Sequence, residues 1–112
     1  MLTEDVSYGI YNSVMERWIK PVSFEWDAGN RDKSFRKHGV NNAECEEVFF
    51  DPHKRLLGPR LHGVGVHRED RYLLIGRTKA LRALFVVFTL RHGKIRVVSA
   101  RDLNRKERGL LP

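Results

Sequence analysis

Hydrophobic and polar positions alternate most regularly between residues 71 and 101, where three apolar runs follow one another. The runs are RYLLIGRT, ALFVVFTL and IRVVSAR, and short polar breaks separate them, one of which contains His92-Gly93. Short apolar runs joined in this way are typical of an antiparallel three-stranded meander with tight hairpins. Because side chains alternate along a strand, residues two positions apart share a face. The expected same-face pairs are Leu73 with Ile75, Phe85 with Val87, and Ile95 with Val97.

The stretch before the meander carries the signals of one short strand and two helices. Residues 24–26 form a candidate strand, and Asp27 is a suitable N-cap for a helix over residues 28–38 that ends at Gly39. A second helix is expected over residues 43–50. Its N-cap is Asn41 or Asn42, and Asp51-Pro52 ends it.

The remaining segments are less regular. Residues 53–70 are expected to form a loop or a weak strand, and a candidate edge strand would contain Leu61, Val64 and Val66. Residues 102–110 predict a final helix that is capped by Asp102 and rich in Arg and Lys. Residues 1–20 predict an N-terminal extension with a short helix, and residues 21–112 a single domain.

This order of elements predicts an α+β fold. Two helices precede the meander and one follows it, so the helices are expected to pack on one face of an antiparallel sheet. With 112 residues, 41% of them hydrophobic and 31% charged, the chain has the size and composition of one globular domain.

The net charge narrows the class of partner. It is +7 at pH 7, with a pI of about 10.0, which indicates a polyanionic partner such as RNA, DNA, an acidic protein or an anionic membrane surface. No apolar run is long enough to span a bilayer, and no signal sequence is expected. The single Cys45 excludes an internal disulfide and a cysteine zinc site, and it is expected to be a buried thiol.

Three arginines are expected at one end of the meander. In an up-down-up arrangement, Arg77, Arg82 and Arg101 all fall at the same rim of the sheet. Planar guanidinium groups bind phosphate oxygens in a bidentate manner, so this rim is the leading candidate site. Arg71 would lie about 20 Å from Arg77 at about 3.3 Å per residue. The alternative is that these arginines make only surface ion pairs.

Several stretches resemble one known family. FEWD at 24–27, KHGV at 37–40, EEVFFDP at 46–52, RYLLIGRT at 71–78 and IRVVSARDLNRKERG at 95–109 resemble the BrnT toxins of type II toxin–antitoxin systems. The resemblance covers residues 24–109 in the expected order. It implies a fold similar to the RelE ribonucleases and a cytoplasmic endoribonuclease that cuts RNA and arrests translation. It also implies a BrnA-like antitoxin with a ribbon–helix–helix part, a hetero-oligomeric complex, and contact with operator DNA only through the antitoxin.

The expected chemistry is attack of the ribose 2′-oxygen on the adjacent phosphate, without a metal or other cofactor. Arg77, Arg82 and Arg101 would stabilise the charge that develops on the phosphate. His38 is the leading candidate for proton transfer, because imidazole titrates near neutral pH. A histidine at a helix C-terminus also has a structural explanation.

Other residues are candidates for supporting roles or are alternatives to those above. Substrate contacts are expected from Arg71, Glu69, Arg105 and Arg108, and His62, His67 and Glu69 are alternative groups for proton transfer. Two other kinds of protein stay open, namely a basic RNA- or DNA-binding module that does not cleave and a pure protein-interaction module.

Overall fold

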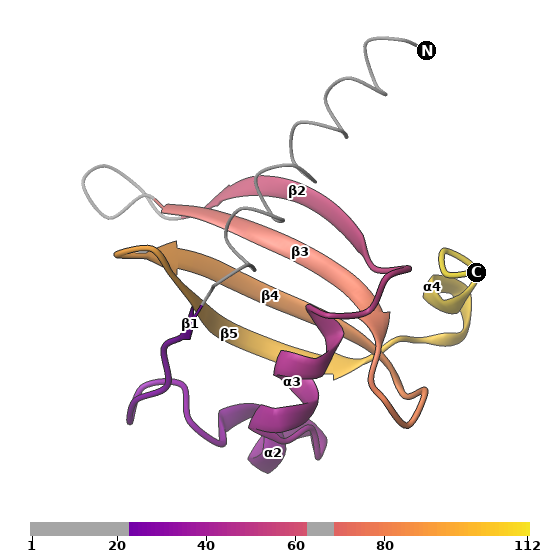
Figure 1. Cartoon of the computed structure of the whole chain (residues 1–112), viewed down its shortest axis with the longest axis horizontal. Helices are drawn as coiled ribbons and strands as arrows, with labels where there is room; N and C mark the ends of the chain where they lie inside the picture. Colours follow the sequence, from indigo (N-terminus) through magenta and orange to yellow (C-terminus); the bar gives the residue numbers. More distant parts are fainter. Residues whose placement is uncertain (1–22, 63–68) are drawn as a thin grey trace, which may run out of the picture.

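The fold is built on a five-stranded sheet (Figure 1). The computed structural model describes residues 23–62 and 69–112, so the predicted N-terminal extension lies outside the described residues. The strands are β1 (Ser23–Phe24), β2 (Arg55–His62), β3 (Glu69–Arg77), β4 (Ala83–Arg91) and β5 (Lys94–Asp102), arranged in the order β1-β5-β4-β3-β2.

The predicted α+β class is confirmed, but the sheet is mixed and not purely antiparallel. β1 pairs with β5 in the parallel direction, whereas the other neighbouring strands are antiparallel. No hairpin joins β1 to β5, so no tight turn dictates its direction. The chain passes from β1 through two helices before it begins β2 at the opposite edge of the sheet.

The predicted meander is present as β3, β4 and β5. One cross-strand row contains Ile75, Phe85 and Arg101, and the adjacent row contains Leu74, Val86 and Ala100. His92 and Gly93 both have positive φ, 50° and 74°, as the two-residue turn between β4 and β5 requires. The register of β4 and β5 shifts between Val87 and Phe88, which marks a bulge.

β2 corrects the expectation of a loop or weak strand over residues 53–70. It begins at Arg55 and pairs with β3, and its register shifts between Leu57 and Arg60. Gly58 with φ 115° and the following Pro59 cause this irregularity, because proline cannot donate to the ladder. Leu61 lies in the strand, while Val64 and Val66 lie outside the described residues.

The first helix is shorter than predicted. α2 spans Lys33–His38, and Asp27 does not cap it. The intervening chain is held as turns because the buried Asn30 side chain donates to the Val97 carbonyl at 3.0 Å and to the Glu25 carbonyl at 2.9 Å. At the other end, Gly39 has φ 68° and caps α2, as predicted.

The caps of the other two helices explain their bounds. α3 spans Asn42–Val48, and Asn41 is its N-cap, which confirms one of the two predicted candidates. α4 spans only Arg105–Arg108 and is capped by Asn104. The prediction that Asp102 caps this helix is wrong, because Asp102 still belongs to β5.

Two apolar clusters lie on the two faces of the sheet. α2 and α3 cover one face (Figure 1), where Val40, Cys45, Val48 and Phe49 pack against Leu74, Leu84, Val86 and Phe88. On the opposite face, Ile75 packs with Leu103 and Leu111, which flank α4. Burial raises the pKa of the Cys45 thiol to about 12, so the predicted buried thiol is confirmed. Among the described residues, no helix is long and apolar enough to cross a membrane.

Candidate functional site

The sheet face opposite α2 and α3 carries a group of arginines. Ile75 and Phe85 lie on this face, and strand alternation from them places six arginines with described side chains there. One of them, Arg96, is paired with Glu25 and Asp27. We call the surface formed by the other five the arginine face; it consists of Arg55, Arg71, Arg77, Arg91 and Arg101. A face with this excess of guanidinium groups attracts polyanions.

Arg101 is the most firmly oriented of these arginines. Its guanidinium lies 4.4 Å above the centre of the Phe85 ring. Its Nη1 and Nη2 atoms donate to the two Glu107 carboxylate oxygens at 2.8 and 2.9 Å. This bidentate pair, with help from the Asn104 backbone N–H, lowers the pKa of Glu107 to about 2. Arg101 is therefore fixed at the end of β5, with its side chain still partly exposed.

Arg77 lies at the same end of the arginine face. Its side chain donates to the main-chain oxygen of Pro112 at 3.4 Å, and no Asp or Glu side chain pairs with it in the described part of the chain. Its backbone N–H donates to Asp51 Oδ2 at 2.7 Å, which fixes the end of β3 against the segment after α3. Arg55, opposite Ile75, also has no carboxylate partner among the described residues. Both charges are available to an anionic ligand.

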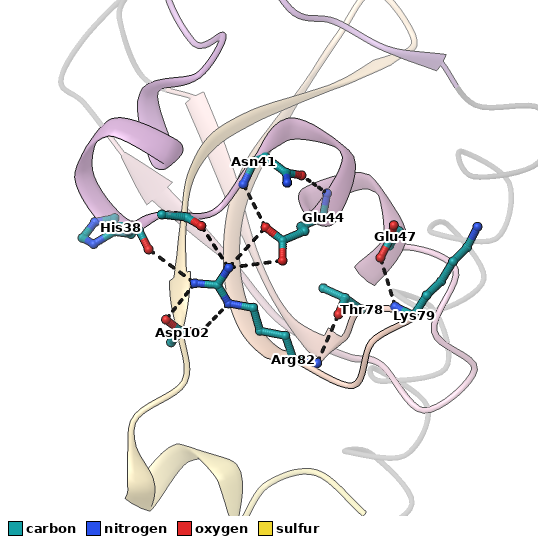
Figure 2. A network of polar contacts seen from close by, with 9 residues as sticks. His38, Asn41, Glu44, Glu47, Thr78, Lys79, Arg82 and Asp102 are labelled. Carbon is teal, nitrogen blue, oxygen red and sulfur yellow. Dashed lines mark hydrogen bonds and ion pairs between the residues drawn. The ribbon is translucent and has the colours of Figure 1, made fainter.

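Arg82 lies on the opposite side of the sheet from Arg77 and Arg101. Figure 2 shows its guanidinium at the centre of a polar network that joins three segments of the chain. Its Nε and Nη2 atoms donate to the Asp102 carboxylate at 2.7 and 3.0 Å, and its Nη1 donates to both Glu44 oxygens at 3.2 Å.

The same guanidinium also caps the end of α2. Nη1 of Arg82 donates to the Gly39 carbonyl at 2.9 Å, and Nη2 donates to the His38 carbonyl at 3.4 Å. These bonds hold the pKa of Arg82 well above its usual range, and the bond from Arg82 holds the pKa of Asp102 below its usual range. With its donors engaged in this way, Arg82 fastens α2 and the start of α3 to the end of β5.

His38 is the last residue of α2 and is exposed. In Figure 2 its imidazole points away from the Arg82 guanidinium, and only its carbonyl joins the network. The structure therefore does not bring the His38 ring together with Arg77 and Arg101. Of the alternative groups, His67 lies outside the described residues, and the His62 side chain does too.

The predicted substrate contacts fall into two places. Glu69 and Arg71 lie at the start of β3, at the far end of the arginine face, where Glu69 pairs with Arg71 at 3.4 Å and with Arg91 at 3.8 Å. Arg105 and Arg108 are exposed on α4, close to Arg101 because Glu107 of the same helix binds it. Only the second pair adds positive charge near Arg77 and Arg101.

Sequence reasoning missed Arg55 and Glu107. Arg55 precedes the Gly58-Pro59 interruption, which hides the alternation of β2. The signal for Glu107 was present, because Asn104 and Glu107 have the spacing of a capping box. Within the described residues, no group of three or more His, Cys, Asp or Glu side chains could hold a metal ion.

A comparison with protein families identifies the chain. The sequence model of one family, the ribonuclease toxin BrnT of type II toxin–antitoxin systems, matches residues 26–107. A comparison with curated proteins finds no match. The matched segment contains α2, α3 and the whole sheet apart from β1, together with Arg77, Arg101 and most of α4. The chain therefore belongs to the BrnT family of ribonuclease toxins of type II toxin–antitoxin systems.

Proposed function

We propose that this toxin is a metal-independent endoribonuclease that cleaves mRNA and thereby inhibits translation. The observation that carries the proposal is the pair formed by Arg77 and Arg101 at one end of the arginine face. Arg77 has no Asp or Glu partner among the described residues, and the guanidinium of Arg101 is fixed by Phe85 and Glu107. The Nη1 and Nη2 atoms of Arg101 already bind Glu107, so its Nε–H, together with the guanidinium of Arg77, would meet a phosphate that gains charge during reaction.

The proposed reaction begins with attack of a ribose 2′-oxygen on the adjacent phosphorus. The bond from phosphorus to the 5′-oxygen breaks, so the products are a 2′,3′-cyclic phosphate and a 5′-hydroxyl end. Arg77 and Arg101 would contact the non-bridging oxygens of this phosphate. Arg105 and Arg108 would contact neighbouring phosphates, because α4 lies next to Arg101.

The groups that move protons stay predictions. His38 is retained as a candidate base or acid, although its ring points away from the Arg82 network. Glu107 is a poor proton acceptor, because its pKa is held near 2. Arg82 would act by holding the fold at this end of the sheet, and Glu69 and Arg71 would bind a more distant part of the RNA.

The partners proposed for this toxin follow from its family. A type II system includes a protein antitoxin, and we propose that this one is BrnA-like, with a ribbon–helix–helix part. The complex would be a hetero-oligomer that reaches operator DNA only through the antitoxin. Messenger RNA as the substrate would place the activity in the cytoplasm. The likeness of the fold to the RelE ribonucleases stays a prediction.

The test is RNA cleavage by purified protein in EDTA. We would compare the wild type with Arg77→Ala, Arg101→Ala and the control Arg36→Ala, which removes an exposed arginine from α2 on the other side of the sheet. Loss of one group that stabilises the reacting phosphate typically costs about 10²–10³-fold in rate. We therefore expect that loss for the first two variants, wild-type cleavage for Arg36→Ala, and 2′,3′-cyclic phosphate ends.

Other results would contradict parts of the proposal. Equal cleavage by Arg77→Ala and Arg101→Ala would move the site away from the arginine face. Bound but intact RNA, with Arg101→Lys as effective as the wild type, would favour a non-catalytic binding module, because lysine keeps the charge but loses the fork. Cleavage only after addition of Mg²⁺ would refute metal independence.

A further inference from the structure

A groove of about 710 Å³ lies between α3, the loop from β3 to β4, and the end of the chain. Its apolar lining consists of Ala43, Phe50, Pro52, Leu81, Leu111 and Pro112. Phe50 and Leu81 are 61% and 72% exposed, so two large apolar side chains face solvent at one site. Exposed apolar surface gathered in a concave site is typical of places where another molecule binds.

The backbone at Leu81 provides a second, independent argument. Leu81 lies in the loop that joins β3 to β4 and has φ 70°. The Leu81 N–H donates to the Thr78 carbonyl, and the Thr78 N–H donates to the Arg82 carbonyl, which is the pattern of a short hairpin loop that usually has glycine at this position. A side chain is unfavourable there because Cβ crowds the following carbonyl oxygen. Leu81 is thus unfavourable in the free protein for two reasons, its exposed apolar side chain and its positive φ. A contact between this side chain and a partner explains why leucine stands at this position.

The charge of the groove indicates the class of partner. Its rim holds three carboxylates, Glu46, Glu47 and Asp51, against two cations, Arg77 and Lys79, in a chain whose net charge is +7. This is an acidic site on a basic protein, so it disfavours RNA phosphates and favours a basic side chain.

These carboxylates are held in place. Glu46 accepts from the Trp26 indole N–H at 2.7 Å, and Glu47 accepts from the Lys79 backbone N–H at 3.0 Å. Asp51 accepts from the backbone N–H groups of His53 at 2.9 Å and Arg77 at 2.7 Å. Each carboxylate has capacity to accept a further hydrogen bond. A Lys or Arg of a partner would find fixed acceptors at the rim.

We propose that this groove is the docking site of the protein antitoxin. The segment that binds would place two neighbouring apolar side chains against Phe50 and Leu81, and a Lys or Arg beside Glu47 and Asp51. Arg77 lines the groove and also ends the arginine face, so the seated segment would exclude RNA from that end. This inference rests on the proposed function, because the partner is the antitoxin and the excluded ligand is RNA.

The test is titration of this toxin with the purified antitoxin that is encoded beside its gene. The variants are Leu81→Gly and Phe50→Ser, with Phe35→Ser as the control, since Phe35 is a similarly exposed phenylalanine, at 56%, that lies outside the groove on α2. We expect binding at least tenfold weaker for each groove variant and within twofold of the wild type for Phe35→Ser. Leu81→Gly separates binding from folding, because glycine accepts φ 70° and leaves the thermal midpoint unchanged or higher.

Three outcomes would overturn the proposal. They are wild-type affinity for both groove variants, absence of binding to the wild type, and a dimer of the free toxin that Leu81→Gly dissociates. The dimer would identify a second copy of this chain as the occupant. RNA cleavage by the free proteins is measured in parallel, where both groove variants should match the wild type. If the groove variants lose antitoxin binding but the wild type does not cleave RNA, the docking site is retained and the proposed enzymatic activity is refuted.

Discussion

Replacement of Arg82 by alanine should reveal a structural role for a residue that the sequence predicted to be catalytic. Arg82 makes a bidentate pair with Asp102, a second pair with Glu44, and a bond to the Gly39 carbonyl (Figure 2). The Arg82→Ala change removes all of these at once. It leaves the Gly39 carbonyl and the Glu44 carboxylate without this donor at the junction of α2 and α3.

The loss of stability expected for Arg82→Ala follows from the exposure of each group that Arg82 binds. The Asp102 side chain is 51% exposed, so its pair with Arg82 contributes about 0–1 kcal/mol. The Glu44 side chain is 23% exposed, and its bond contributes about 1–1.5 kcal/mol, at the lower end for a charged partner. The bond to the Gly39 carbonyl adds about 1 kcal/mol. We therefore expect a loss of about 2–3.5 kcal/mol, which corresponds to a fall in Tm on the order of 10–25 °C.

The assay combines urea unfolding with RNA cleavage at a temperature where the variant is still folded. Arg36→Ala is the matched control, because Arg36 is an exposed arginine of α2 that forms no salt bridge with any described residue. Arg82→Lys should fall between alanine and the wild type, since an ammonium group cannot make the bidentate pair with Asp102 while it binds Glu44.

The decisive result is the cleavage rate of folded Arg82→Ala. The structural role requires lower stability together with a rate within about threefold of the wild type, which is about 0.65 kcal/mol in activation free energy. Unchanged stability combined with a hundredfold slower reaction would refute this reasoning and restore Arg82 to the catalytic group.

Three further predictions concern single residues. The pKa of Glu107 is lowered from 4.5 to about 2, so its ion pair with Arg101 stabilises the fold above about pH 4.5. That contribution is lost as the pH falls from 4.5 towards 2. Glu107→Gln should therefore flatten the pH dependence of the urea midpoint between these pH values. Cys45, whose pKa is raised to about 12, should react with a disulfide reagent at pH 8 only in denaturant, and fast labelling of the native protein would contradict its burial. Gly76→Ala should lower the free energy of unfolding by about 1–3 kcal/mol, because the added Cβ would lie 2.9 Å from Val48 Cγ1. The control is Gly109→Ala at an exposed position. Equal unfolding midpoints for the two variants would count against close packing at β3.

The sequence predicted the meander because its signals are local. Alternating apolar runs define β3, β4 and β5, and His92-Gly93 marks one turn. The first helix was predicted too long because the interaction that interrupts it is not local. Asn30 is tethered to Val97, 67 positions further along the chain, and no pattern around Asn30 indicates that contact.

The sequence predicted that Arg77, Arg82 and Arg101 lie at one end of the sheet. It did not predict that Arg82 lies on the opposite face from the other two. Alternation assigns Arg77 and Arg101 to one face once the strands are correctly placed. Arg82 lies in a loop, where alternation does not apply, and its orientation depends on Glu44 and Asp102. The placement of Arg55 on the arginine face could not be predicted, because it depends on the β2 register, which the Gly58-Pro59 interruption conceals.

The position of Arg77 indicates how the antitoxin could silence the toxin without deforming it. Arg77 ends β3 on the arginine face and also lines the groove. Its side chain has no Asp or Glu partner among the described residues, so under these proposals it would bind an RNA phosphate or lie under a docked antitoxin segment, but not both. Arg101 stays fixed to Glu107 and Phe85 in either state, because neither residue lines the groove. If the groove is the docking site, competition at Arg77 would be sufficient for neutralisation, and removal of the antitoxin should restore activity without refolding of the sheet.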